Sequence, residues 1–205
     1  MKNSIYFLLI ALLACATASC ASAPTTPISL PKDVPLADGG YLDKVWLNRS
    51  AISEKLYSGI ELSPITAIGV SDGKAVTVDD AKSWLREGFV GDSSRKTPTV
   101  GTMTKSVARL NLVVTEIDPG STAARFWAGE LGAGHAWVQV EGTLLGLEDH
   151  PVLAYFAHRQ RASGVLTLEN SRGKDSSPVL IRRMMLASGK KFRKEAMSTL
   201  NIEAK

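Results

Sequence analysis

The chain has 205 residues, of which 44% are apolar, enough for one ordinary globular domain once an export segment and a tether are subtracted. Its 24 Lys and Arg exceed its 20 Asp and Glu by only four, which is too little positive charge for a nucleic-acid-binding domain. Both cysteines, Cys15 and Cys20, precede residue 21, so the rest of the chain has no thiol for a disulfide, a metal site or a nucleophile.

The N-terminus has the pattern of a signal peptide. Lys2 supplies a positive charge, residues 5–14 form an unbroken apolar run, and small residues follow at once. The apolar run is too short to span a bilayer comfortably. We therefore predict a signal peptide over residues 1–19 and export from the cytoplasm.

Two cleavage sites compete after the apolar run. Cleavage after Ala18 by the ordinary secretory peptidase would release a soluble protein, whereas residues 17–20 (TASC) resemble a lipobox, whose cysteine receives diacylglycerol. A second imperfect match ends at Cys15 but would leave an unusually short signal. We favour a lipoprotein acylated at Cys20, with palmitate-type chains that anchor it to a membrane. Ala21 resembles the residue found at this position in lipoproteins sorted to the outer membrane, facing the periplasm.

The lipidated cysteine is expected to be followed by a proline-rich tether, so that residues 20–40 form one unit. Residues 21–40 hold four of the nine prolines and end in two glycines, without a sustained periodicity. From residue 41 onward, strand and helix patterns alternate. We therefore expect a single globular domain over residues 41–205.

An irregular strand and a helix are expected first in this domain. Residues 55–70 are rich in β-branched and apolar side chains but contain Pro64, which is typical of an edge strand. Residues 77–89 begin with Thr77 and have Asp80 three positions later, which indicates a helix N-terminus. The face of this helix that is expected to pack inward carries Ala81, Trp84 and Leu85.

Further strands are expected in the second half of the chain. Alternating apolar side chains predict them at 106–117, 135–147, 152–158 and 164–169. A short turn at 148–151 joins the second and third, which makes them antiparallel. The sequence therefore predicts an α+β fold, with one or two helices packed on one face of a mostly antiparallel sheet.

Residues 177–201 are predicted to form a long amphipathic helix. Ser177 suits the N-cap position, Pro178 suits the first helical position, and the Ser-Gly pair at 188–189 is a point of possible interruption. The expected buried face carries Ile181, Met185, Phe192 and Ala196. The rest of the helix is rich in basic residues, namely Arg182, Arg183, Lys190, Lys191, Arg193 and Lys194. A solvated face explains this pattern, and so does contact with anionic lipid headgroups or another acidic envelope surface.

Residues 115–164 carry one family pattern. It combines a strand, a Gly-Ser turn, an arginine, a Gly-Ala-Gly run and a β-hairpin, and the matching positions are Gly120, Ser121, Arg125, Gly129, Gly132, Ala133 and Gly134. The pattern resembles bacterial envelope lipoproteins grouped as domains of unknown function, with a looser likeness to lipoproteins that regulate cell-wall synthesis or assemble secretion pores. Residues 148–151 (EDHP) depart from the Asp-Ala-x-Thr-Gly turn of those relatives. The resemblance implies an envelope lipoprotein without implying a role.

We predict that a partner-binding surface lies within residues 115–164. Arg125 could pair with an anionic ligand between Phe126 and Trp127, although these side chains could equally belong to the core. Residues 129–134 (GELGAG) match a phosphate-binding loop poorly, because the P-loop lysine is missing and a strand follows instead of a helix. Turn geometry explains this run better. The glycines included in the surface are Gly129, Gly132 and Gly134.

No catalytic or metal site can be assembled from the sequence. His135, His150, His158 and Asp149 are the candidate metal ligands, but none of their spacings matches a known motif, so surface or hydrogen-bonded histidines are favoured. A Gly-x-Ser-x-Gly nucleophile motif is missing, and no cofactor is expected.

Three functional hypotheses remain from the sequence. The first is a non-enzymatic envelope protein that binds another envelope component while anchored to the membrane, with its oligomeric state left open. The second is a periplasmic hydrolase that uses Asp149, His150 or other scattered polar residues. The third is a protein that binds a small ligand on its sheet.

Overall fold

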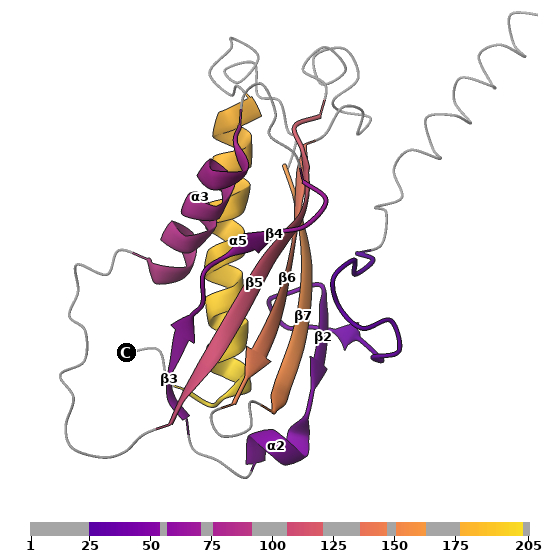
Figure 1. The fold of residues 1–205 in the computed structure, drawn as a ribbon, viewed down its shortest axis with the longest axis vertical. Coiled ribbons are helices and arrows are strands. Elements are labelled where there is room, and N and C mark those ends of the chain that lie inside the picture. The colour runs from indigo at the N-terminus through magenta and orange to yellow at the C-terminus, as the bar shows by residue number, and fades with distance from the viewer. Residues whose placement is uncertain are drawn as a thin grey trace, which may run out of the picture.

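A computed structural model describes residues 25–53, 57–70, 76–91, 106–120, 136–146, 151–162 and 177–202. In these ranges the chain forms one sheet with two helices packed on one of its faces (Figure 1). The predicted α+β class is therefore confirmed. The turn predicted at 148–151 and the strand predicted at 164–169 lie outside the described residues.

The sheet has seven strands. They are β1 (Ala37–Asp38), β2 (Lys44–Leu47), β3 (Tyr57–Leu62), β4 (Thr66–Ala67), β5 (Ser106–Asp118), β6 (Trp137–Leu145) and β7 (Val152–Arg161). Their order across the sheet is β1-β2-β7-β6-β5-β3, and β4 also pairs with β5. The pairs β1-β2, β2-β7, β7-β6 and β6-β5 are antiparallel, whereas β3 and β4 run parallel to β5. The sheet is thus mostly antiparallel, as predicted.

Pro64 explains why the strand predicted at 55–70 is irregular. Proline has no N–H to donate, and the segment is split at this point into β3 and β4. β3 lies at the end of the strand order, as the edge-strand prediction requires. A helix follows β4 and leads back to β5, and such a crossover is what parallel pairing needs.

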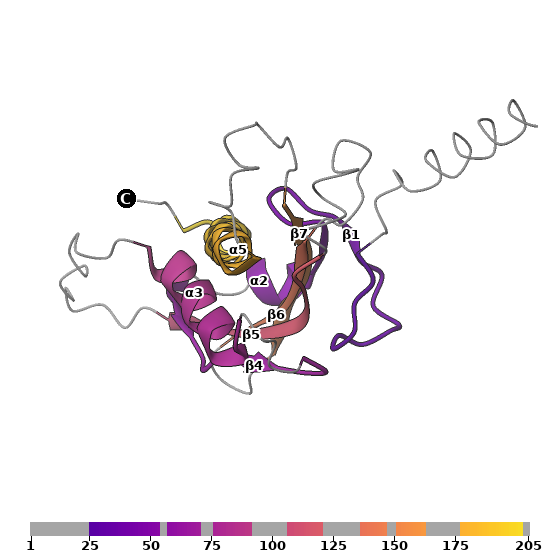
Figure 2. The same ribbon diagram turned by 90° about the horizontal axis from the view of Figure 1, so that it is seen from above.

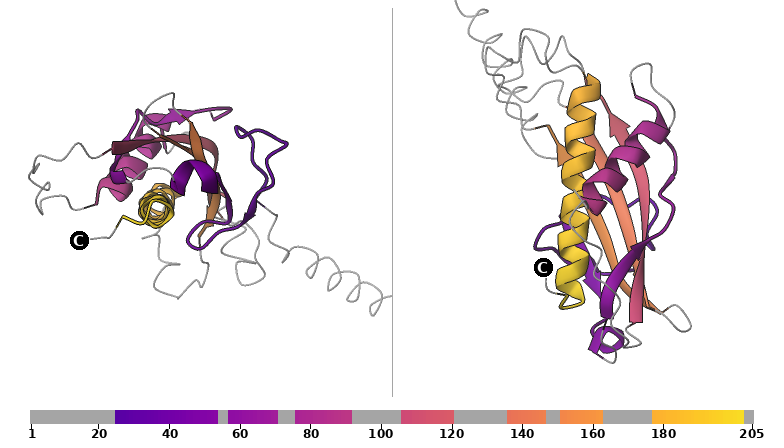
Figure 3. Two further views of the ribbon diagram at one scale, coloured as in Figure 1. Left: turned by 90° about the horizontal axis from the view of Figure 1, so that it is seen from below. Right: turned by 90° about the vertical axis from the view of Figure 1, so that its left-hand side faces the viewer.

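Two helices, α3 (Val78–Val90) and α5 (Ser177–Thr199), lie side by side on one face of the sheet (Figure 3). The helix start predicted at Thr77 is confirmed, because the Thr77 hydroxyl accepts the Asp80 N–H at 3.1 Å and the Asp80 carboxylate accepts the Thr77 N–H at 3.3 Å. A third, short helix, α2 (Arg49–Ser53), follows β2. The two-helix layer on one face was expected from the sequence, and α2 was not.

The helices approach most closely at a pair of glycines. A Cβ added to Gly88 would lie 2.3 Å from the Leu186 carbonyl oxygen, and one added to Gly189 would lie 2.4 Å from that of Leu85. α5 runs through residues 188–189 without a break, so the possible interruption at this pair does not occur. Gly189 serves close backbone contact between two helices and does not end one.

The core lies between the helices and the inner face of the sheet. The expected inward faces are confirmed, since Ala81 and Leu85 on α3 and Ile181, Met185, Phe192 and Ala196 on α5 are all fully buried. Trp84 is partly buried and packs against the same cluster. The ring of Phe192 meets Phe156 edge-on, with centroids 6.3 Å apart, which joins α5 to β7.

Part of the predicted tether is packed against the domain. Residues 25–36, which we call the strap, lie on the face of the sheet opposite α5 (Figure 2), and Leu30 in the strap is buried. β1 follows directly and pairs with β2. Residues 25–40 therefore belong to the folded domain, and only the residues before 25 remain a predicted tether.

Candidate functional site

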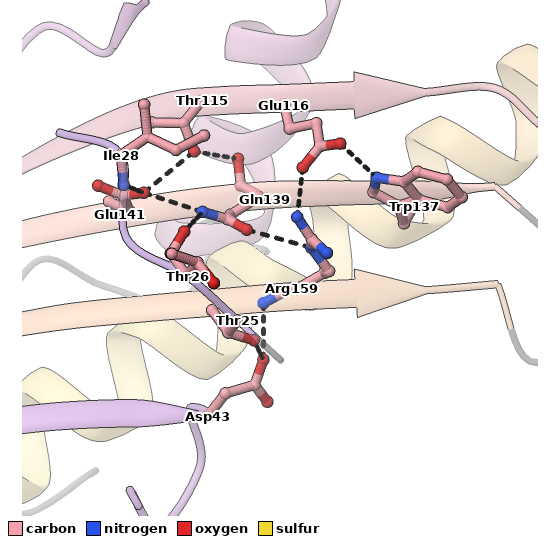
Figure 4. Close-up of polar contacts among 10 residues, drawn as sticks. All are labelled: Thr25, Thr26, Ile28, Asp43, Thr115, Glu116, Trp137, Gln139, Glu141 and Arg159. Carbon is pink, nitrogen blue, oxygen red and sulfur yellow. Dashed lines mark hydrogen bonds and ion pairs between the residues drawn. The ribbon is translucent and has the colours of Figure 1, made fainter. Parts of the chain in front are cut away.

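Gln139 and Glu141 on β6 are fully buried, although they do not face the helices. They alternate with Val138 and Val140, which belong to the core, so the two polar side chains point to the outer face of the sheet. Polar side chains on such a face ordinarily contact water. Here the strap covers them, and they form the centre of a polar site that holds it (Figure 4).

The Glu141 carboxylate is the main attachment point of the strap. It accepts hydrogen bonds from the backbone N–H groups of Ile28 and Ser29, each at 2.7 Å, and from the Ser29 hydroxyl at 2.5 Å. The Thr115 hydroxyl and the Gln139 amide lie 3.3 and 2.9 Å from the same carboxylate. These donors satisfy the oxygens of a carboxylate that is fully buried.

Gln139 links the strap to a row of charged side chains. Its amide nitrogen donates to the Thr26 carbonyl at 2.8 Å, and its amide oxygen accepts from Arg159 Nε at 3.1 Å. The Arg159 guanidinium also pairs with Glu116, which accepts the Trp137 indole N–H at 2.8 Å. Figure 4 shows this row crossing from β5 over β6 to β7. Residues far apart in the chain are therefore tied to one another at the place where the strap lies.

Asp43, which directly precedes β2, holds the start of the strap. Its carboxylate accepts the Thr25 hydroxyl and the Arg159 backbone N–H, both at 2.7 Å, and lies 3.2 Å from His158 Nδ1. Burial alone would raise the pKa of the Asp43 carboxyl, but the hydrogen bonds from His158, Arg159 and Thr25 outweigh it and lower the pKa well below its usual range. Asp43 is therefore charged at any ordinary pH.

His158 connects Asp43 to α5. Its Nε2 lies 3.2 Å from Lys191 Nζ, and Lys191 also donates to Gln160 Oε1 at 2.9 Å. Gln160 Oε1 also lies 3.2 Å from Nε2, so this nitrogen contacts both a donor and an acceptor, while Nδ1 faces the Asp43 carboxylate. His158 is thus a buried histidine with a partner at each ring nitrogen. This agrees with the expectation of a hydrogen-bonded histidine, while His135, His150 and Asp149 lie outside the described residues.

A second buried carboxylate fixes the loop before β2. Glu195 on α5 accepts the backbone N–H groups of Tyr41 at 2.6 Å and of Leu42 at 3.3 Å. The Tyr41 side chain is half exposed, and Lys194 lies over its ring with Nζ 5.7 Å from the centroid. The end of α5 is therefore attached to the same edge of the sheet that holds Asp43.

The six basic residues predicted as a possible anionic-surface contact are all described, but they have different surroundings. Arg182 pairs with Glu87 at 3.4 Å and Arg193 donates to the Val90 carbonyl at 3.0 Å, so both turn toward α3. Lys191 turns toward the sheet. The side chains left on the outward face of α5 are those of Arg183, Lys190 and Lys194.

The remaining site predictions cannot be placed. Cys20 and the expected partner surface, which comprises Arg125, Phe126, Trp127, Gly129, Gly132 and Gly134, lie outside the described residues. Sequence reasoning in turn missed Asp43, Gln139, Glu141 and Arg159. The alternation along β6 could have located Gln139 and Glu141 on the outer face, but nothing local indicates that a segment more than 100 residues earlier covers them.

The chemistry of this site is that of an anchor for the strap. The carboxylates of Glu141 and Asp43 are engaged by several donors each, which leaves little room for a role as general base. In the part of the chain that the structure describes, there is no group of three His, Cys, Asp or Glu side chains suited to a metal ion. None of the described helices is long and apolar enough to cross a membrane.

Comparison with known proteins gives weak structural likenesses only. No protein-family model and no curated protein matches the sequence. Among solved structures, the chain is similar to a Xanthomonas campestris protein of family DUF330, with a TM-score of 0.44 and 12% identity over 86% of this chain and 93% of that one. It is similar to PelC from Paraburkholderia phytofirmans, solved as a dodecamer, with a TM-score of 0.36 and 10% identity over 77% and 94% of the two chains.

A protein from Caulobacter crescentus, provisionally named a lipoprotein, gives a TM-score of 0.35 and 10% identity over 76% of this chain and 100% of that one. At TM-scores below 0.5, these likenesses carry no argument about function or assembly. The functional proposal therefore has to stand on the residues of this chain.

Proposed function

We propose that the protein is an exported lipoprotein of the bacterial cell envelope, anchored through Cys20, whose domain is held close to the membrane to bind another envelope component. The signal-like residues 1–19 and the lipobox-like residues 17–20 support export and acylation. The observation that carries the proposal is the attachment of the strap, because it fixes where the chain leaves the domain.

The strap leaves only a short connection to the proposed lipid. Thr25 is hydrogen-bonded to Asp43, and four residues, 21–24, separate it from Cys20. Five steps of extended chain at about 3.6 Å each span at most ~18 Å. A lipid on Cys20 would therefore keep the strap edge of the domain near the headgroups. A free tether of twenty residues would allow a much longer reach.

A short connection suits a protein that acts on a partner at the same membrane. We place this membrane as the outer one, facing the periplasm, because Ala21 follows the cysteine. The partner surface that we propose is the Arg125 to Gly134 stretch, which could face a neighbouring envelope protein with an arginine and two aromatic residues.

The lipid assignment is tested by replacing the cysteine. Cys20→Ser should move the protein from the membrane fraction to the soluble fraction, and intact mass of the wild-type protein should give an acylated N-terminal cysteine. The matched control is Cys15→Ser, which should leave the acylated protein in the membrane. Membrane retention of Cys20→Ser, or a mature wild-type protein that begins at Ser19 without lipid, would refute the anchor.

The partner surface is tested separately in the anchored protein. Arg125→Ala should reduce crosslinks to envelope proteins without releasing the protein from the membrane. Arg86→Ala, which removes an exposed arginine on α3, is the control. If both variants form the crosslinks of the wild type, the 125–134 stretch is not the binding surface.

A further inference from the structure

The outward face of α5 carries a row of cations. Arg183, Lys190 and Lys194 are spaced at i, i+7 and i+11, which places them on one side of a helix. All three are exposed. Neither Lys190 nor Lys194 has a carboxylate within salt-bridge distance among the described residues, whereas Arg182 on the adjoining face has Glu87. Lys190 and Lys194 are therefore positive charges that the described part of the domain does not neutralise.

Tyr41 extends the row to the edge of the sheet. Glu195 holds its backbone N–H, and the ring lies under Lys194 with about half of its surface exposed. Tyrosine beside lysine is a combination typical of the zone where a protein meets lipid headgroups, because the ring is amphipathic and the ammonium binds phosphate. We call Tyr41, Arg183, Lys190 and Lys194 the basic edge.

The basic edge lies beside the point where the chain leaves the domain. Tyr41 is two residues from Asp43, at most ~7 Å along the chain, and Asp43 holds Thr25. The contacts from Asp43 through His158 to Lys191 join the same point to α5. If Cys20 carries a lipid, the bilayer surface is within about 18 Å of Thr25 and so within reach of this edge.

We propose that the basic edge rests on the phosphates of anionic lipid headgroups and orients the domain on its membrane. The proposal rests on the proposed anchor for the position of the membrane, but the contact itself does not need the lipid. Among the other charges near this edge, Lys44 pairs with Asp38 at 2.7 Å, and the carboxylates of Asp43 and Glu195 accept backbone N–H groups. Lys190 and Lys194, which have no carboxylate partner among the described residues, are exposed charges that remain available at this edge.

The test uses the Cys20→Ser protein, which lacks the lipid, and vesicles of phosphatidylcholine with or without phosphatidylglycerol. We expect cosedimentation with the phosphatidylglycerol vesicles, weakened by salt because exposed charges are screened over about 10 Å at 0.1 M. Lys190→Gln with Lys194→Gln should weaken binding about ten-fold or more, since each basic residue near an anionic surface contributes about five-fold. Tyr41→Ala should weaken it as well.

The matched control is Lys82→Gln with Arg86→Gln on α3, which removes the same charge away from the strap edge. Equal losses in the two double variants would overturn the proposal, because net charge alone would then explain binding. Equal binding to both kinds of vesicle would overturn it too. The two tests are independent. Loss of vesicle binding would not affect the Cys20 anchor, and a negative result for Cys20 acylation would not affect the vesicle result.

Discussion

Three carboxylates of this protein, of which those of Glu141 and Glu195 are buried, accept hydrogen bonds from backbone N–H groups. Glu141 accepts the N–H groups of two strap residues, and Glu195 accepts those of Tyr41 and Leu42. Asp43 accepts the Arg159 N–H at the edge of β7. Glu141 and Glu195 supply acceptors to segments that lack a regular strand partner, and Asp43 does so on β7 just beyond its pairing with β2. This satisfies buried N–H groups that would otherwise cost about 1–3 kcal/mol each.

Asp43 predicts a specific loss of stability in acid. Its folded-state pKa lies below the ordinary value of about 3.9, so its contribution is complete above that pH and is lost as the pH falls through the folded pKa. Asp43→Asn should destabilise the protein by about 1–2 kcal/mol at pH 5, because Asp43 is partly exposed and its interactions are screened.

Urea unfolding of both proteins between about pH 5 and pH 3 measures this difference, which should shrink as the pH is lowered. Asp38→Asn is the control, since that carboxylate is 88% exposed and forms a surface ion pair with Lys44. A difference between wild type and Asp43→Asn that stays constant over this range would contradict the assigned role of the carboxylate.

Single residues of this site were hard to predict because their partners are remote. Gln139 and Glu141 alternate as residues on the solvent-facing side of a strand do, and only the position of the strap turns them into buried acceptors. The basic residues of α5 were identified from composition. In the fold, Lys191 contacts His158 whereas Lys194 lies over Tyr41. Helical periodicity alone does not predict this difference, because it depends on tertiary packing.

Elements with a strong local pattern were predictable, and those without one were not. α3, α5 and β5 to β7 follow from periodicity and capping, and the capping box of Thr77 and Asp80 fixes where α3 begins. β1, β2 and α2 are short and have few repeats of any pattern. The strap has a composition typical of an unstructured linker, because proline removes donors and prevents regular pairing. Side-chain acceptors on β6 hold it instead of a strand ladder.

Glu141→Gln should release the strap. The substitution places an amide donor against the N–H groups of Ile28 and Ser29 and removes the charge that strengthens these hydrogen bonds. We expect a loss of about 2–4 kcal/mol in the free energy of unfolding and faster hydrogen exchange at these two amides. Glu61→Gln on β3 is the control, because its 3.7 Å pair with Arg109 is exposed and contributes little. Equal effects of the two substitutions would mean that the strap is not held by Glu141.

For the whole molecule, the attachment of the strap sets how far the domain can move from its proposed anchor. The segment 21–24 limits the reach, and the basic edge selects which side of the domain faces the membrane. These two effects respond differently to salt. Headgroup contact is screened, whereas the length of the connection is not. High salt therefore isolates the contribution of the short connection.

Inserting a flexible Gly/Ser segment of about twenty residues between residues 22 and 23 should separate the domain from the membrane. Such a segment adds roughly 25 Å to the average reach. With the lipidated protein in vesicles that carry a dansyl headgroup lipid, we expect energy transfer from the four tryptophans of the chain to fall strongly at high salt. At low salt the fall should be smaller, because the basic edge still holds the domain down. The same segment appended after Lys205 should change neither value. Unchanged transfer after the insertion at high salt would mean that the connection before Thr25 does not set the height of the domain, and that another contact holds it at the membrane.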